Sequence, residues 1–346
     1  MQKNFLVSII INNYNYDRFL AQAIDSALNQ TYPHTEVIVV DDGSTDNSRE
    51  IIAGYGDRII PILQPNGKQA AAFNSGLKRS LGDILIFLDS DDYLYPQAVE
   101  RIVEVWQPNL SKVHYRLEVV DADRQSLGYT FPQGSEPLST GEVWQTLLSY
   151  GGYVRVPTSG NALNRNALLS IFPIPDEFKL TADDYLSVLV PFAGEVGAVE
   201  DPLGAYRIHG SNQWALATVT SDRFHRFIKH DQVVYKLLVD KAEELGYKLP
   251  QDFELRSLGR YQVRLASVRL TPEKHPIPQD RILYLVYSGI KSIWKYSTMS
   301  WQKKFIYTVW FLWIGFVPLT LAKPAITWFF TPHFRPKLLK KIYASV

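Results

Sequence analysis

The sequence predicts an α/β protein with a mostly parallel sheet flanked by helices, and three features of its first hundred residues support this. Uninterrupted apolar runs occur at 37–40 and 84–88, as in strands that are buried on both faces of a sheet. Stretches with helical spacing separate these runs, which is the order of a parallel sheet with crossover connections. Acidic residues follow both runs directly, at 41–42 and 89–92.

Helical periodicity and punctuation place the remaining elements of the first half. Residues 18–30 carry apolar side chains at the spacing of an amphipathic helix, 68–80 is rich in alanine, and Pro96 is suited to open a helix. A turn leads from the second strand into another helix, with Ser44 or Thr45 as its N-cap. We expect strands at 5–12, 36–40, 59–63 and 83–88, and helices at 18–30, 68–80 and 96–106.

The alternation is less regular beyond residue 110. The segment 271–279 contains three prolines and is expected to be a linker after a charged helical region. We expect strands at 113–120, 128–131, 195–202 and 205–209, and helices at 142–150, 165–171, 183–192 and 221–245, with further helix up to residue 270.

Composition limits the chemistry. The chain has no cysteine, which excludes disulfides, thiolate metal sites and a thiol nucleophile and permits an intracellular location. No signal peptide is expected, because the first four residues lead directly into a strand. Residues 281–346 hold ten of the 36 Lys and Arg and none of the 35 Asp and Glu. The preceding part is therefore acidic, and the last part is basic and aromatic.

The acids after the two apolar runs predict a metal site at one edge of the sheet. Ligands bind at the carboxyl ends of strands in open α/β folds. Three carboxylates within the four residues 89–92 repel one another unless a cation holds them. Hard oxygen ligands with phosphates in the remaining positions suit Mg²⁺ or Mn²⁺. The pattern favours an enzyme that handles a nucleotide diphosphate.

Other classes of protein lack their required residues. No Gly-x-x-x-x-Gly-Lys-Ser/Thr or Gly-x-Gly-x-x-Gly pattern follows a strand, so ATPases and NAD dehydrogenases have no phosphate-binding loop here. A calcium loop starting at Asp89 would place Tyr93 and Leu94 where an oxygen ligand and a glycine are needed. A receiver domain would carry its acids after the first strand, whereas here they follow the second.

Six motifs over about the first hundred residues resemble the start of a family 2 glycosyltransferase with the GT-A fold, and the similarity continues more thinly to His209. The resemblance implies a Rossmann-like catalytic domain at 1–215, with a nucleotide-binding half at 1–110 and an acceptor half at 111–215. A helical extension would follow at 216–280. The motifs are VSIIINNYN at 7–15, SALNQT at 26–31, EVIVVDDGSTD at 36–46, NGK at 66–68, AFNSG at 72–76 and FLDSDD at 87–92.

The resemblance implies how the donor is bound. Asp42 would accept a hydrogen bond from the uracil of a UDP-sugar, and Asn12 and Tyr14 would line the base. Lys68 and Asn74 would lie beside the nucleotide.

The D-x-D region is implied to bind the metal and the ribose. Asp89, Ser90 and Asp91 would contact the nucleotide, and Asp91 and Asp92 would hold Mg²⁺ or Mn²⁺. Many relatives have arginine where this chain has Phe73, so Lys68 would take over a diphosphate contact.

Three later segments complete the implied site. The pair Asp183-Asp184 resembles the family's acidic pair, with Asp184 as the catalytic base and Asp183 as the alternative. The segment 206–209 resembles Tyr-Arg-x-His, whose histidine faces diphosphate and metal. The segment 159–161 resembles the small residues that border the acceptor pocket. The implied acceptor or diphosphate residues are Gly160, Asn161, Arg207 and His209, the last also a metal ligand.

The implied activity is transfer of a sugar from a nucleotide donor to a glycan or lipid-linked acceptor, with inversion at the anomeric carbon. Two alternatives stay open: a nucleotidyltransferase, although 12–17 has no glycine for its basic loop, and a non-catalytic sugar-nucleotide-binding protein. No nucleic acid partner is expected, and the sequence does not indicate an oligomeric state.

The segment 281–346 is expected to associate with a membrane. Its charge-free part, 305–322, has lysines on both sides, contains Trp310 and Trp313, and is at the lower limit of length for a span. Three interpretations stay open: a helix in the membrane interface, a single span, or a buried helix that packs on the catalytic domain. A basic cluster follows at 335–341. We expect a cytoplasmic protein that is peripheral or monotopic at the inner face of the cell membrane.

Overall fold

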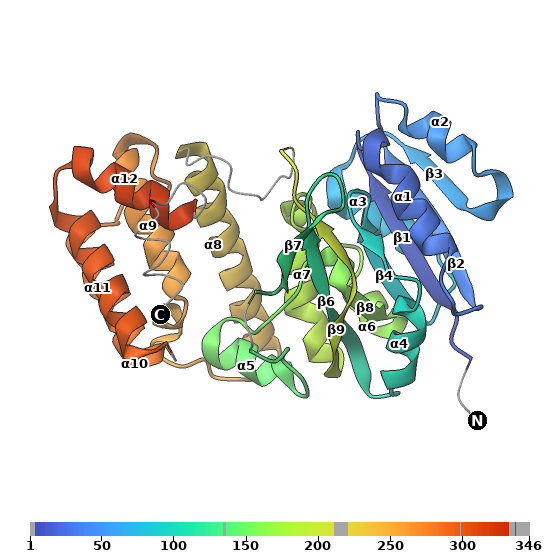
Figure 1. Ribbon diagram of the computed structural model, residues 1–346. Helices are drawn as coiled ribbons and strands as arrows, with labels where there is room; N and C mark the ends of the chain where they lie inside the picture. Colours follow the sequence, from blue (N-terminus) through green and yellow to red (C-terminus); the bar gives the residue numbers. More distant parts are fainter. Residues whose placement is uncertain (1–3, 134–135, 211–220, 298, 332–335, 337–346) are drawn as a thin grey trace. The chain divides into compact units, whose positions relative to one another are not determined.

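The computed structural model describes residues 4–133, 136–210, 221–297, 299–331 and Pro336. They form two compact units (Figure 1). Unit 1 comprises Met1–Gln145 and Tyr153–His209, and unit 2 comprises Thr146–Gly152 and Gly210–Val346. The predicted domain boundary at residue 215 lies outside the described residues, and so do the cations at 335, 337, 340 and 341 of the predicted basic cluster.

A mixed sheet forms the centre of unit 1 and contains nine strands among the described residues, in the order β3-β2-β1-β4-β8-β6-β9-β5, with β7 paired to β6. The first four neighbours run parallel, β8 is antiparallel to both β4 and β6, and β6 and β9 run parallel. The predicted mostly parallel α/β architecture is confirmed. The strands are β1 (Val7–Asn13), β2 (Thr35–Asp42), β3 (Ile60–Gln64), β4 (Ile84–Asp89), β5 (Tyr93–Leu94), β6 (Leu110–Val120), β7 (Ser126–Phe131), β8 (Asn161–Asn164) and β9 (Glu195–Arg207).

Helices cover both faces of this sheet because its central strands are apolar on both sides. In β1, Ile9 and Ile11 pack in one core with α1 and α4, while Ile10 faces Gly76 of α3 on the other side. Phe73 of α3 stacks on Phe87 of β4 with ring centroids 4.1 Å apart. The helices of unit 1 are α1 (Asp17–Leu28), α2 (Ser48–Ala53), α3 (Lys68–Arg79), α4 (Ala98–Val105), α6 (Arg165–Leu169) and α7 (Ala182–Leu189), and α5 (Val143–Tyr150) belongs from Thr146 on to unit 2.

Unit 2 is helical, with its own apolar core. Buried side chains of α9, α10, α11 and α12 meet there, including Tyr261, Leu285 and Phe311. Trp294 of α10 donates a hydrogen bond to Thr308 of α11 at 3.0 Å. The helices are α8 (Ser221–Glu244), α9 (Leu258–Leu270), α10 (Ile282–Tyr296), α11 (Trp301–Phe316) and α12 (Leu319–Phe330) (Figure 1).

Three local predictions were wrong, and a segment with three open interpretations took an unexpected form. The short strands β5 and β8 were not predicted. The segments 195–202 and 205–209 form one strand, β9, whose pairing with β6 shifts register near Pro202. Neither Ser44 nor Thr45 caps α2, which starts after Asn47. The charge-free stretch 305–322 is divided between α11 and α12, because Val317 is extended before Pro318. No helix in the described ranges combines the length and the apolar character that crossing a membrane requires.

Close packing between α10 and α11 can be tested with two glycines of unit 2. A Cβ added at Gly289 would collide with the ring of Phe311, whereas one added at Gly259 in α9 meets no described heavy atom within 4 Å. We expect Gly289→Ala to lower the free energy of unfolding by about 1–3 kcal/mol. The control Gly259→Ala should leave it unchanged or raise it by up to about 1 kcal/mol. Denaturant unfolding followed by circular dichroism measures both, and equal effects would contradict the described packing.

Candidate active site

The carboxyl ends of β1, β2 and β4 bring together acids that are far apart in the sequence. Asn12 at the end of β1 lies beside Val40 and Asp89 in the flanking strands. Its amide donates to the Asp89 carboxylate at 2.8 Å. Nε2 of His209 lies 3.0 Å from Oδ2 of Asp91. The structure therefore gathers the D-x-D acids and His209 at one edge of the sheet, where the sequence predicts them.

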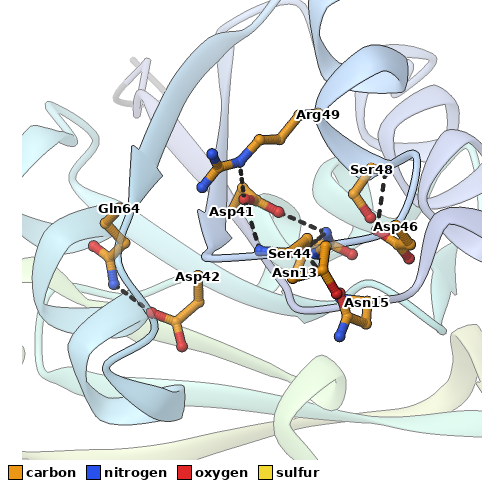
Figure 2. A network of polar contacts seen from close by, with 10 residues as sticks. Asn13, Asn15, Asp41, Asp42, Ser44, Asp46, Ser48, Arg49 and Gln64 are labelled. Atoms are coloured by element: carbon orange, nitrogen blue, oxygen red, sulfur yellow. Dashed lines mark hydrogen bonds and ion pairs between the residues drawn. The ribbon is translucent and has the colours of Figure 1, made fainter.

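Asp42 anchors the segment that leads into α3. Its Oδ1 accepts hydrogen bonds from the Gln64 side chain at 2.7 Å and the Gly67 backbone at 2.9 Å, and its Oδ2 accepts one from the Lys68 backbone at 2.7 Å (Figure 2). A carboxylate offers about four acceptor positions. Those three bonds leave one position on Oδ2 for a ligand, so the predicted contact with the base is compatible with this anchoring role.

Lys68 and Tyr14 form an exposed pair next to this anchor. The Lys68 ammonium lies 5.5 Å from the centroid of the Tyr14 ring, whose residue is 41% exposed. Lys68 has a φ of 71°, a conformation that costs a non-glycine residue of order 1–3 kcal/mol. Its backbone bond to Asp42 holds it there. The sequence predicts that both residues contact the nucleotide.

A second network, centred on Asp41, shapes the turn after β2 (Figure 2). Burial alone would raise the pKa of Asp41, but hydrogen bonds from Ser44 and Arg49 outweigh it and hold the pKa below its ordinary value. Asn13 donates to both Asp41 and Ser44 at 3.1 Å. Ser44 also accepts the backbone N–H of Asn15, which explains why it does not cap α2. Sequence reasoning did not single out Asn13 or Arg49.

Two predicted ligand-binding residues have structural partners instead. Asp92 is buried, and its carboxylate accepts the Arg207 backbone N–H at 2.9 Å and the Ser159 hydroxyl at 2.7 Å. The Arg207 guanidinium donates to the backbone carbonyl of Asp91 at 2.7 Å and to Gln22 at 2.6 Å. These bonds fix the backbone around Asp91, and they do not favour Asp92 as a metal ligand or Arg207 as a diphosphate contact.

The segment 159–161 supports the site through Ser159. Gly160 is buried, and a Cβ there would come 2.9 Å from the carbonyl oxygen of Tyr115. The Asn161 amide donates to the carbonyls of Pro157 and Thr158, within its own turn. Gly160 and Asn161 thus shape the turn, and Ser159 is the residue that reaches the acids.

Asn74 and Ser90 are predicted to contact the nucleotide, but within the fold one is hydrogen-bonded to a loop and the other is buried. The Asn74 side chain accepts the backbone N–H of Ile174 at 2.9 Å and donates to its carbonyl at 3.2 Å, so it holds a loop. Ser90 is buried at 3% exposure. Phe73, at the position where relatives carry arginine, is buried against Phe87 and supplies no diphosphate contact.

The acidic pair opens α7 and lies close to the D-x-D acids. Burial raises the pKa of Asp183 to about 7, and the charges of Asp184 and Asp89 add to that shift. Asp184 forms an ion pair with Arg155 at 2.7 Å. The Gln69 side chain accepts the backbone N–H of Ala182 at 3.0 Å and also bonds Asp89, which ties α7 to β4. No local pattern in the sequence pointed to Gln69 or Arg155.

The D-x-D acids occupy an electrostatically costly position. Burial and, to a smaller extent, the charge of Asp91 together raise the pKa of Asp89 to about 6. Burial, then Asp91 and Asp89, also hold the pKa of Asp92 well above its ordinary value. The like charges therefore disfavour full ionisation unless a cation is present.

Asp91 and His209 fit a divalent cation. The His209 ring packs between Tyr16 and Phe19, with centroids 5.5 and 4.9 Å away, and its Nε2 is held at Asp91. Within the described ranges, no group of three His, Cys, Asp or Glu side chains is placed to hold a metal ion. A site with one carboxylate and one imidazole instead suits Mg²⁺ or Mn²⁺ that takes further ligands from phosphate and water.

Comparison with known proteins identifies relatives of this chain. The family model described as Glycosyl transferase family 2 matches residues 8–130. The uncharacterized glycosyltransferase alr2836 of Nostoc sp. is 34% identical over 268 residues, which cover 74% of this chain and 83% of that protein. Chondroitin synthase of Pasteurella multocida is 38% identical over 143 residues, 39% of this chain and 15% of that protein. The chain spans less than half of the length of the other curated relatives that it matches.

A solved structure has the same fold. Residues 1–349 of S. aureus TarS, in complex with UDP-GlcNAc, align over 94% of this chain and 91% of that chain with a TM-score of 0.52 and 14% identity. This similarity confirms the predicted GT-A-like fold. With the family model and the Nostoc relative, it leads to one conclusion: the chain is a glycosyltransferase and belongs to glycosyl transferase family 2.

Proposed function

We propose that the chain is an inverting glycosyltransferase that takes a sugar from a UDP-sugar, with Mg²⁺ or Mn²⁺, and moves it to a hydroxyl of a glycan or lipid-linked acceptor. The observation that carries the proposal is the proximity of the acidic pair at 183–184 to Asp89, at the edge that also holds Asp42 and Asp91. One edge thus provides residues for a nucleotide, a cation and a base. TarS was solved with UDP-GlcNAc, which supports UDP as the nucleotide.

We assign the catalytic base to Asp184. A base must be ionised to accept the proton of the acceptor hydroxyl, and the ion pair with Arg155 favours the charged carboxylate. Asp183 is partly buried and has a raised pKa, so its carboxyl holds a proton more readily. Neighbouring carboxyls with different environments take different roles. A positioned base contributes roughly a hundredfold or more to the rate.

The leaving diphosphate needs positive charge beside it. Asp91 and His209 would hold the divalent cation, which as a Lewis acid would stabilise the departing phosphate. Lys68, whose ammonium lies over the Tyr14 ring, would contact the nucleotide. Asp42 would orient the base through its remaining acceptor position.

An aromatic pair supports a sugar acceptor. Burial, then the charges of Asp92 and Asp91, raise the pKa of the Tyr206 hydroxyl, which places Tyr206 beside the acids. The Phe131 ring, 40% exposed, lies 5.7 Å from the Tyr206 ring. Aromatic faces pack well against the C–H faces of sugar rings. We infer that an acceptor sugar approaches the acids over Phe131.

The first test measures the reaction class. With Mn²⁺, a UDP-sugar donor should be hydrolysed slowly to UDP and free sugar even without an acceptor, and chelation should stop this. A nucleotidyltransferase would instead consume a nucleoside triphosphate and release pyrophosphate. A non-catalytic binding protein would show a thermal shift with UDP and no hydrolysis. Either of the last two results would overturn the proposal.

Replacing the base should separate chemistry from binding. We expect Asp184→Asn to lower the rate of donor hydrolysis or transfer at least about a hundredfold, because the base is lost. UDP should still raise the melting temperature as in the wild type. The comparison variant Asp183→Asn should retain more activity than Asp184→Asn. If Asp184→Asn turns over at the wild-type rate, Asp184 is not the base.

Removing the imidazole should weaken the cation site. His209→Ala should reduce the stabilisation by UDP with Mn²⁺ while leaving the smaller shift by UDP alone. The control His34→Ala changes an exposed histidine at the opposite end of β2 and should behave as the wild type. Differential scanning fluorimetry across Mn²⁺ concentrations measures this. An unchanged Mn²⁺ dependence in His209→Ala would exclude His209 as a ligand.

The raised pKa of Asp183 predicts how stability depends on pH. Its folded pKa of about 7 lies above the unfolded value of 3.8, so the folded chain keeps a proton that the unfolded chain releases. This contribution is fully present below about pH 4 and is lost as the pH rises through 7. Asp183→Asn should therefore reduce the decline in melting temperature between pH 5 and 8, by at least about 2 °C. The exposed control Asp57→Asn should keep the wild-type decline, and an equal decline in both variants would contradict the assignment.

A further inference from the structure

Exposed apolar side chains of the described residues are concentrated in α10, α11 and the start of α12. Half of the exposed large apolar residues in the described ranges lie within 283–321. Six of them form what we call the aromatic face: Leu283, Tyr287 and Trp294 of α10, and Trp301, Phe305 and Phe316 of α11. Their exposures range from 53% to 70%. An apolar concentration of this kind is typical of an interaction surface.

The two faces of α11 explain why its sequence is apolar all round. Trp310, Phe311 and Ile314 are buried in the core of unit 2. Trp301, Phe305 and Phe316 recur at the spacing of one helix face and lie on the opposite side, exposed. Packing within unit 2 therefore uses one half of the apolar surface of α11 and leaves the other half uncovered.

The exposed stripe of α10 continues this surface. Leu285 and Ile293 face the same core as the buried side of α11, while Leu283, Tyr287 and Trp294 point away from it. Trp294 bonds Thr308 of α11, so the helices are in direct contact. The buried sides of α10 and α11 face one core. Their exposed stripes therefore lie on the outer side of the helix pair.

The segment that carries the aromatic face has charges of one sign, although Asp252 of unit 2 pairs with Lys295 at 3.0 Å. Residues 281–331 contain six Lys and Arg and no Asp or Glu. Lys303 and Lys323 are exposed near the two ends of the apolar stretch. Tryptophan with lysine beside an apolar surface is the composition of helices that lie in a membrane interface.

We propose that the aromatic face inserts into the surface of a bilayer that contains anionic lipids and holds the protein there as a monotopic enzyme. The apolar side chains enter the boundary between headgroups and acyl chains, and the lysines meet lipid phosphates. A two-fold contact between copies fits less well, because it would set Lys303 and its neighbours against the same cations of the second copy. This inference does not depend on the sugar that is transferred.

Vesicle sedimentation with the full chain tests the proposal. Wild-type protein should pellet with sucrose-loaded vesicles of phosphatidylcholine and phosphatidylglycerol, and less with phosphatidylcholine alone or at high salt. The variant Trp301→Gln/Phe305→Gln/Phe316→Gln should partition at least about tenfold less, since each side chain loses apolar burial. Lys303→Gln/Lys323→Gln should lose most of the preference for phosphatidylglycerol.

Matched controls change exposed residues of unit 1. Leu81→Gln/Leu169→Gln removes exposed leucines, and Lys78→Gln removes an exposed cation, and both should bind vesicles as the wild type does. Circular dichroism and donor hydrolysis without vesicles check that each variant is folded. Wild-type protein that stays in the supernatant with anionic vesicles would overturn the proposal. So would a triple variant that binds normally, or one that only abolishes a concentration-dependent dimer.

Discussion

Repulsion among buried carboxylates is the constraint on which the rest of the site depends. Asp89, Asp91 and Asp92 follow one strand, and α7 adds Asp183 close to them. At Asp89 and Asp92 the protein reduces this repulsion with uncharged backbone and side-chain donors, while Arg155 pairs with Asp184. Asp92 accepts a backbone N–H and a hydroxyl, and Asp89 accepts an amide. These donors are neutral, so the site keeps an unbalanced negative charge that attracts a cation carrying a diphosphate.

Several of the acids therefore stabilise the backbone, and fewer of them remain to bind ligands. Asp41 fixes the turn after β2 through Ser44 and Arg49 (Figure 2). Asp42 fixes the turn between β3 and α3 through the backbone of Gly67 and Lys68. Hydrogen bonds to charged groups contribute about 1.5–3 kcal/mol each. Acids that the sequence suggests are all ligand-binding thus include several that hold the backbone in place. We propose that the chemistry falls to Asp91, Asp184 and His209.

The sequence predicted the elements whose apolar periodicity is strong. It did not predict the strands and contacts that depend on pairing between distant segments. The strands β1, β2 and β4 are long apolar runs whose burial needs no further information, so their acids could be placed at one edge. In contrast, β8 has asparagine at both of its ends and forms a strand only because β4 and β6 flank it. The engagement of Asp92 with Arg207 joins residues 115 positions apart, and no local pattern reports such a bond. Gln69 and Arg155 were missed for the same reason.

The C-terminal helices show how one apolar run can satisfy two environments. Eighteen uncharged residues could indicate a span, an interfacial helix or a buried helix. The extended Val317 before Pro318 ends α11 after Phe316, which makes it too short for a span. Its buried face forms core with α9 and α10, so half of its surface is that of a packed helix, but one that packs within unit 2 and not, as predicted, on the catalytic domain. A helix that needed only protein contacts would carry polar side chains on its outer face. The exposed Trp301, Phe305 and Phe316 side chains, in a segment that has cations and no acid, agree with the proposed insertion into an anionic bilayer.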